Sequence, residues 1–141
     1  MADGTSDFAR SMSIATSGLR AQAGRMRVIS ENIANADSTA PTSAGDPYRR
    51  KVPTFSSTLD RSLDARVVTL GNVRTDQSAF RIKHEPSNPS ADAAGNVKYP
   101  NVNSLVEMTD MREAQRSYEA NLNIISATRR MIQRTLDILK A

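Results

Sequence analysis

The two ends of the chain carry the strongest pattern in the sequence. Residues 8–36 and 103–141 each place apolar side chains at a 4,3 spacing, and every proline lies between these two segments. Because this spacing puts the apolar side chains on one narrow stripe of a helix, both segments are predicted to be long amphipathic helices. Two such stripes cannot both be buried inside one small globule. The sequence therefore predicts helices that pack against neighbouring molecules.

The expected fold class is mainly α. The chain leaves the first helix, forms an insert and returns through the second, so the two long helices are expected to form an antiparallel, coiled-coil-like hairpin. The expected organisation has three parts: an N-terminal tail and core helix over 1–36, a loop and small β-containing or irregular insert over 37–102, and a C-terminal core helix over 103–141.

Within the insert, short apolar runs predict strands. Residues 66–70 (RVVTL) followed by Gly71 and Asn72 resemble the first half of a hairpin with a two-residue turn. Residues 80–83 alternate as a half-buried strand does, and a turn is expected ahead of residues 97–99. These pieces carry few large apolar side chains, so the insert is expected to pack on the helices.

Three local features refine the helices. Ser104 and Glu107 form an S-x-x-E capping box, with Asn103 as an alternative cap for the second helix. Gly18 and Gly24 fall inside the helical pattern of the first helix, and they predict either a close approach of another segment or, less favoured, a bend. Polar residues within the seams either set register or face water, and both interpretations stay open; they are Gln22, Asn32, Asn35, Gln115 and Asn121.

Composition narrows the function classes. The net charge of +4 is dispersed, and the only run of three cations is Arg49, Arg50 and Lys51. A nucleic-acid binder normally has a concentrated basic face, so this class is disfavoured. The chain has no cysteine, and its one histidine, His84, has no second histidine or cysteine to complete a common metal site. We therefore expect no metal, no cofactor and no enzymatic activity, because no nucleophile or phosphate-binding motif is present either.

The sequence shows no pattern typical of a membrane-spanning segment or of a cleavable signal peptide. No stretch of about 18 apolar residues exists, so no direct membrane insertion is expected. The start of the sequence is acidic and lacks the charged and apolar regions of a cleavable signal peptide. If the protein leaves the cytosol, another export route is expected.

Several motifs together resemble one family. Residues 17–22 (SGLRAQ) and 29–36 (ISENIANA) are similar to the N-terminal signature of flagellar rod, hook and hook-associated proteins. A narrower set of segments resembles the proximal-rod proteins of the bacterial flagellar basal body. These segments are 38–41 (STAP), 47–51 (PYRRK), 99–103 (YPNVN), 107–111 (EMTDM) and 116–121 (RSYEAN).

The resemblance implies a structural subunit of the rod that crosses the periplasm and transmits motor torque. Members of the family are exported by the flagellar type III apparatus without a cleavable signal and polymerise into a helical tube. The implied partners are copies of the chain, other proximal and distal rod subunits and the rod-to-MS-ring adaptor, with no nucleic acid. The alternative is a cytosolic helical adaptor, which cell fractionation would distinguish from a basal-body protein.

The stripes and one basic segment supply the candidate interface residues. Tyr48 is a rigid amphipathic anchor, and Arg49 and Arg50 are expected to pair with acidic groups on an adjacent subunit. The alternative is a solvated basic loop. The apolar candidates for the subunit interface are Met12, Leu19, Met26, Ile29, Ile33, Met108, Met111, Tyr118, Leu122, Ile125, Ile132, Leu136 and Leu139.

Overall fold

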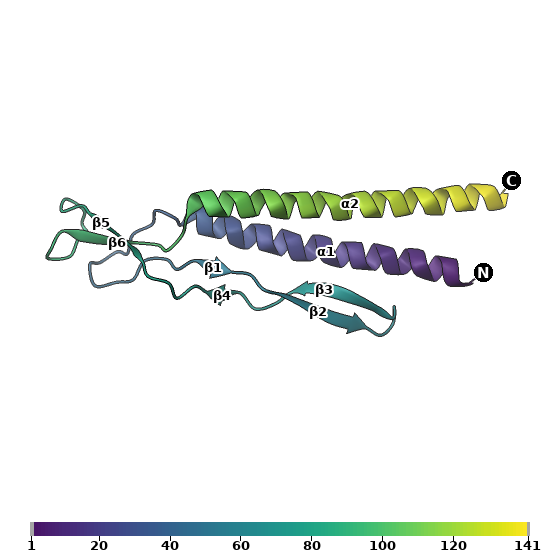
Figure 1. The fold of residues 1–141 in the computed structure, drawn as a ribbon, viewed down its shortest axis with the longest axis horizontal. Coiled ribbons are helices and arrows are strands. Elements are labelled where there is room, and N and C mark those ends of the chain that lie inside the picture. The colour runs from purple at the N-terminus through teal and green to yellow at the C-terminus, as the bar shows by residue number, and fades with distance from the viewer. Residues whose placement is uncertain (1, 141) are drawn as a thin grey trace. The chain divides into compact units, whose positions relative to one another are not determined.

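The computed structural model describes residues 2–140, with side chains from Asp7 onward. Along the sequence, six short strands lie between two long helices (Figure 1). The expected tail over residues 1–7 is helical from Ala2, and Met1 lies outside the described residues. The elements are α1 (Ala2–Ala34), β1 (Lys51–Val52), β2 (Phe55–Asp60), β3 (Ala65–Leu70), β4 (Arg74–Thr75), β5 (Arg81–His84), β6 (Asn96–Tyr99) and α2 (Ser104–Lys140).

The expectation of a mainly α, coiled-coil-like hairpin is wrong. The fold is mixed, with 49% helix and 18% strand, and the strands form three small antiparallel sheets. The sheets pair β1 with β4, β2 with β3, and β5 with β6. The chain divides into two compact units, and each long helix contributes to both of them. The terminal unit contains the chain up to Met26, residues 54–72 and the chain from Glu113 on; the middle unit contains Arg27–Pro53 and Val73–Arg112.

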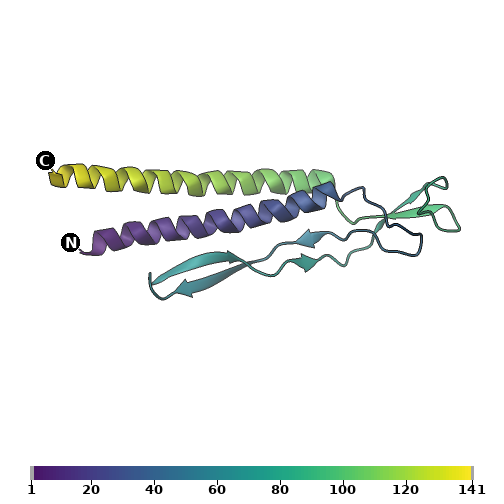
Figure 2. The ribbon, with the colours of Figure 1, turned by 180° about the vertical axis from the view of Figure 1, so that it is seen from behind.

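In the terminal unit, α1 lies between α2 and the β2–β3 hairpin, as Figures 1 and 2 both show. The Ser17 hydroxyl accepts a hydrogen bond from the backbone N–H of Val68 at 3.2 Å, and Arg10 Nε donates to the carbonyl of Leu63 at 2.7 Å. A Cβ atom at Gly24 would lie only 2.7 Å from a methyl group of Leu70. The hairpin therefore packs on α1, and Gly24 allows the close approach that the sequence predicted.

Small side chains fill the space between the two helices of the terminal unit. Ala114 and Thr128 are buried on α2, and Asn121 lies midway between them at a spacing of seven residues. A Cβ atom at Gly18 of α1 would lie 2.9 Å from the amide of Asn121. At this point the two helices therefore approach through a glycine and an asparagine rather than through leucines and methionines. The prediction of a mainly α fold failed because the segment between the helices forms three small antiparallel sheets.

The middle unit has a core of larger side chains. Val28 and Ile29 of α1 are each 2% exposed, and Val97 of β6 and Val102 ahead of α2 are each 1% exposed. The predicted strand at 80–83 and the turn before 97–99 correspond to the β5–β6 hairpin. Gly95 in that turn has φ +77°, a conformation that side chains other than glycine rarely adopt.

The predicted hairpin at Gly71 and Asn72 is wrong. Residues 65–70 instead pair with β2, which precedes them in the sequence, and the turn lies at residues 61–64. Asp60 makes that turn, because its carboxylate accepts hydrogen bonds from the Ser62 backbone N–H at 2.9 Å and the Ser62 hydroxyl at 2.6 Å. This aspartate turn chemistry was overlooked in favour of the glycine signal.

The predicted capping box at the start of α2 is also wrong. The side chain of Asn103 accepts hydrogen bonds from the N–H groups of Leu105 at 3.1 Å and Val106 at 3.4 Å. Asn103 is thus the N-cap, as the alternative interpretation had it. The carboxylate of Glu107 is directed elsewhere, into the middle unit.

Candidate subunit interface

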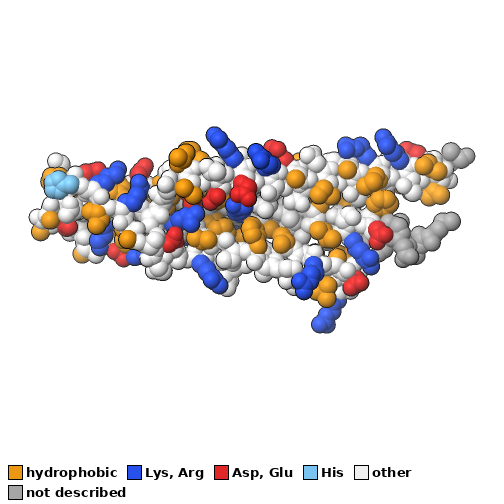
Figure 3. Space-filling model, viewed as in Figure 1, with side chains coloured by type: hydrophobic (Ala, Val, Ile, Leu, Met, Phe, Trp, Pro, Cys, Tyr) orange, Lys and Arg blue, Asp and Glu red, His pale blue; other side chains and the backbone are white. Residues whose placement is uncertain are grey.

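Large apolar side chains are exposed along α2 in the terminal unit. Leu122 is 47% exposed, Leu136 45% and Leu139 72%, although all three belong to the predicted stripe. Figure 3 shows apolar side chains at the surface among arginines along this helix. Further exposed apolar residues of the terminal unit are Ile14, Phe55, Leu59, Ile124, Met131 and Ile138. Leu136 and Leu139 line one groove, and an exposed apolar patch of this kind favours a site of protein contact.

An apolar groove lies where the two helices of the terminal unit run beside each other. Its volume is about 280 Å³, and it is lined by α1 and by the last turns of α2. The lining residues are Phe8, Ala9, Met12, Ile132, Thr135, Leu136 and Leu139. Four of these are predicted interface residues, and the groove provides a concave apolar surface that an apolar side chain of a neighbour could fill.

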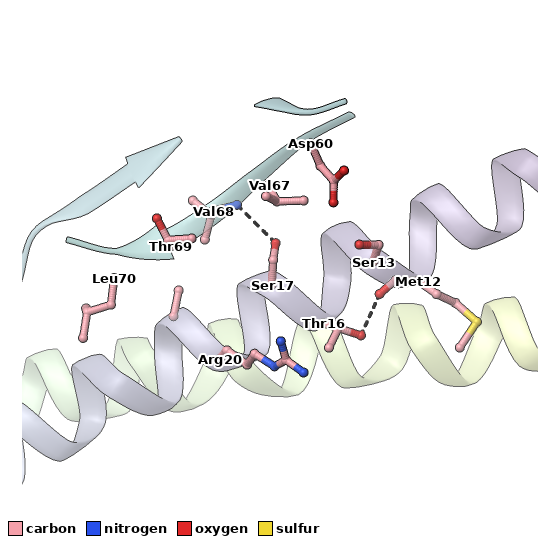
Figure 4. A pocket seen from close by; sticks show the side chains of 11 residues that line it. Met12, Ser13, Thr16, Ser17, Arg20, Asp60, Val67, Val68, Thr69 and Leu70 are labelled. Atoms are coloured by element: carbon pink, nitrogen blue, oxygen red, sulfur yellow. Dashed lines mark hydrogen bonds between the residues drawn. The ribbon is translucent and has the colours of Figure 1, made fainter. Parts of the chain in front are cut away.

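A second, more polar groove of about 500 Å³ lies between α1 and strand β3 (Figure 4). Two of its hydroxyl groups are engaged: Thr16 donates to the carbonyl of Met12 at 2.7 Å, and Ser17 donates to the carbonyl of Ile14 and accepts from the N–H of Val68. The groove is therefore a shaped surface without a free nucleophile at Thr16 or Ser17. Among residues 7–140, no cluster of histidine, aspartate and glutamate has the arrangement of a metal site.

The middle unit contains a buried polar cluster centred on Glu107. This residue is 1% exposed. Its carboxylate accepts a hydrogen bond from Arg50 Nε at 2.6 Å and another from Asn32 Nδ2 at 3.0 Å. Arg50 also lies 3.7 Å from Asp110 and 3.9 Å from Asp76. A buried charge of this kind is tolerated only because it is paired and hydrogen-bonded.

Asn32 connects α1 to the segment ahead of β1. Its side-chain oxygen accepts hydrogen bonds from the Tyr48 hydroxyl at 2.8 Å and the Lys51 N–H at 2.9 Å, and its amide donates to the Lys51 carbonyl at 2.8 Å. Burial raises the pKa of the Tyr48 hydroxyl. A hydrogen bond from Lys51 to Glu31, at 2.9 Å, raises the pKa of the lysine. Asn32 therefore holds this segment against the helix, and facing water is not its role.

The three predicted residues of the basic segment find partners inside the middle unit. Tyr48 bonds Asn32, and Arg50 bonds Glu107. Arg49 makes longer contacts: its guanidinium lies 4.1 Å from the centre of the Phe80 ring and 3.8 Å from Asp46, and it donates to the Ser78 carbonyl at 3.5 Å. These contacts hold the loop, and those of Arg49 are longer than those of Tyr48 and Arg50.

The remaining predicted residues divide by exposure. Ile29 is buried in the middle unit, and Met108 is 51% exposed. The half-buried members of the stripes are Met12, Leu19, Met26, Ile33, Met111, Tyr118, Ile125 and Ile132. Sequence reasoning missed the role of Glu107, because S-x-x-E was read as a helix cap. The available signal was its position in phase with Met111 and Ala114, on the buried side of α2.

Comparison with known proteins identifies the family. A family model described as flagella basal body rod protein matches residues 12–40. A second model, for the C-terminal part of flagellar basal body rod FlgEFG proteins, matches residues 93–138. Both matches fall mainly on the two long helices. Among the described residues, no helix is long and apolar enough to cross a membrane.

Whole-chain relatives agree with these matches. Flagellar basal-body rod protein FlgC of Agrobacterium fabrum is 52% identical over 128 residues, which cover 91% of this chain and 92% of the relative. FlgC of Escherichia coli O6:H1 is 39% identical, covering 89% and 92%, and FlgC of Bacillus subtilis is 36% identical, covering 92% and 97%. Each of these relatives is described as a flagellar basal-body rod protein. The chain therefore belongs to the FlgC family of flagellar basal-body rod proteins, and it is a structural subunit of the basal-body rod.

Proposed function

We propose that this subunit packs with copies of itself and with other proximal and distal rod proteins into a helical tube that crosses the periplasm and transmits motor torque. The observation that supports this most is the exposed apolar surface of the terminal unit, around Leu122, Leu136 and Leu139. Contacts between different surfaces of identical subunits generate helical polymers. The rod-to-MS-ring adaptor and the flagellar type III export apparatus are the further partners that the family resemblance suggests.

In this proposal the predicted apolar stripe meets neighbouring subunits. Fully burying a leucine side chain contributes about 1.5–3 kcal/mol relative to leaving it in water. Several such residues on one helix would stabilise a lateral contact strongly. Arg49 is the member of the basic segment that we propose to contact a neighbour, whereas Tyr48 and Arg50 support it by fixing the loop.

The test replaces Leu122 by aspartate. An unpaired charge buried in a subunit contact costs several kcal/mol, so Leu122→Asp should block incorporation into the rod. The free chain should keep its fold, since the side chain is 47% exposed in it. Asn123→Asp is the matched control, because Asn123 is also exposed and gains the same charge one position further along α2.

Two measurements decide the outcome. Circular dichroism should give similar melting curves for both purified variants, and electron microscopy of basal bodies should count rods in cells that produce each variant. We expect normal rods with Asn123→Asp and none with Leu122→Asp. Normal rods with both variants would show that position 122 is not buried in the assembly.

A further inference from the structure

We infer that the outer edge of strand β2 is a pairing site for the same strand of a second copy of this chain. The two strands would run antiparallel, centred on Ser57, and would join two β2–β3 hairpins into one four-stranded sheet. This inference concerns the free chain and does not rest on the proposed assembly of the rod.

The hydrogen bonding of the hairpin shows which backbone groups are free. The N–H of Gly71 donates to the carbonyl of Thr54 at 2.7 Å, and Phe55 lies opposite Leu70 in the register. Since inward and outward positions alternate along an antiparallel strand, the N–H and C=O groups of Phe55, Ser57 and Leu59 face away from β3. Among the described residues these groups have no hydrogen-bond partner.

The outer edge of β3 is covered by α1, whereas the outer edge of β2 is not covered by any described segment. The outer edge of β3 faces α1, where the N–H of Val68 bonds the Ser17 hydroxyl. The outer edge of β2 has no such cover, and the side chains of Phe55 and Leu59 on it are 43% and 51% exposed. Folded proteins usually block a free edge with a charge, a proline or a bulge. Residues 55–59 (FSSTL) contain no charge and no proline. The one charge of β2, Asp60, lies at the end of the strand, where Ser62 binds its carboxylate.

The sequence of β2 is complementary to itself. In a pair centred on Ser57, Phe55 lies opposite the partner's Leu59, and Ser56 lies opposite the partner's Thr58. Apolar side chains thus meet apolar ones and hydroxyl groups meet hydroxyl groups, and no like charges oppose each other across the two-fold axis. The three outward-facing residues also lie opposite one another, so each can exchange both backbone hydrogen bonds with the second copy. These complementary positions indicate that a second copy of the chain binds to the β2 edge.

The pair belongs to the free chain and cannot be the contact that propagates a rod. Subunits related by a helical operation all point in the same direction, whereas an antiparallel two-fold pair closes on itself. The contact area of two short strands is below that of a standard stable interface. We therefore expect weak, concentration-dependent dimerisation that incorporation into a rod would reverse.

The first test uses the absence of native cysteine. In Ser57→Cys, the two cysteines would face each other with Cα atoms about 5.5 Å apart, within the range of a disulfide. In Ser56→Cys, they would be offset by two residues along each strand and about 8 Å apart, which is too far to bridge. Mild oxidation should therefore link the Ser57→Cys chain into dimers and leave the Ser56→Cys chain unlinked. Equal linkage of both would indicate collision or parallel stacking and would overturn the inference.

The second test removes the outward N–H of Ser57. Ser57→Pro should leave the β2–β3 ladder intact, because a proline is tolerated where its missing N–H would face solvent. Sedimentation equilibrium should show dimerisation at least tenfold weaker for Ser57→Pro than for the control Ser57→Thr. Should the proline disturb the hairpin amide shifts, Ser57→Lys decides instead, because two lysines would then lie directly opposite each other at the two-fold axis and repel. A natural chain that stays monomeric, including one whose β2 edge is used only by another rod protein, would refute the pairing.

Discussion

The two units of the molecule bury different kinds of side chain. In the middle unit the buried apolar residues include Val28, Ile29, Val97, Val102 and Tyr99. In the terminal unit, the buried apolar residues among those described are alanines, at positions 15, 21, 65 and 114. The large apolar side chains of the terminal unit are mostly half-buried or exposed.

This difference indicates where each unit gains its stability. Burial of a valine or isoleucine removes far more apolar surface from water than burial of an alanine. The middle unit also satisfies its buried charge internally, through Arg50 and Glu107. We infer that the middle unit completes its interactions within one chain, whereas the terminal unit depends on neighbouring subunits.

The largest effect is expected at Glu107. Glu107→Ala leaves Arg50 without its closest partner. The expected cost is about 3 kcal/mol, the lower end of the range for breaking a buried ion pair, because Asp110 and Asp76 stay within 4 Å of Arg50. Amide hydrogen exchange in increasing urea should show the loss of stability mainly in the middle unit. Glu119→Ala, at an exposed position of the same helix, is the control and should change the free energy of unfolding by less than about 0.5 kcal/mol. Equal effects of the two variants would contradict a self-contained middle unit.

A smaller effect is expected at Gly18 in the terminal unit. Gly18→Val places methyl groups against Asn121, whose amide already lies 2.9 Å from the position of a Cβ atom. Overpacking of this kind costs about 1–3 kcal/mol. Asn121→Ala should recover part of the loss, and a double-mutant cycle of unfolding free energies measures the coupling. Strict additivity of the two changes would show that the helices are not in close contact at this point.

The smallest effect is a pH dependence in the β5–β6 hairpin. A hydrogen bond from the Tyr99 hydroxyl, at 2.8 Å, lowers the pKa of Glu85, with a further contribution from Asn88. Because the folded-state pKa lies below the unfolded value, this stabilisation is present above the usual glutamate pKa and is lost as the pH falls through the lowered value. An NMR titration of Glu85 should give a higher midpoint in Tyr99→Phe than in the natural chain. Identical midpoints would show that the Tyr99 hydroxyl does not lower the pKa of Glu85.

The periodic parts of the fold were the most predictable from sequence. Both long helices, the strand at 80–83 and the following turn appear in the structure, because amphipathic spacing and glycine turns are local signals. The β2–β3 pairing was not found, since the aspartate turn at Asp60 competes with the glycine signal at Gly71. The mixed fold class was missed because β1 and β4 are only two residues long and β2 is rich in hydroxyl side chains, so none of them has the apolar alternation that marks a strand in the sequence.

The polar cluster was the least predictable part of the site. Asn32, Arg50 and Glu107 are distant from one another in sequence, and only the fold brings Asn32 and Arg50 beside Glu107. The sequence did identify Tyr48 and Arg50 as residues of interest, but it assigned them to a neighbouring subunit. The exposed stripe of α2 was recognised from its spacing, and its contact with neighbours stays a prediction.

Hydrogen exchange on the free chain and on intact basal bodies shows whether the terminal unit needs its neighbours. At concentrations where the free chain is monomeric, we expect strong amide protection in the middle unit and weak protection over residues 8–26 and 113–140. In basal bodies, both units should be strongly protected. Strong protection of the terminal helices in the free monomer would contradict the claim that the terminal unit depends on its neighbours.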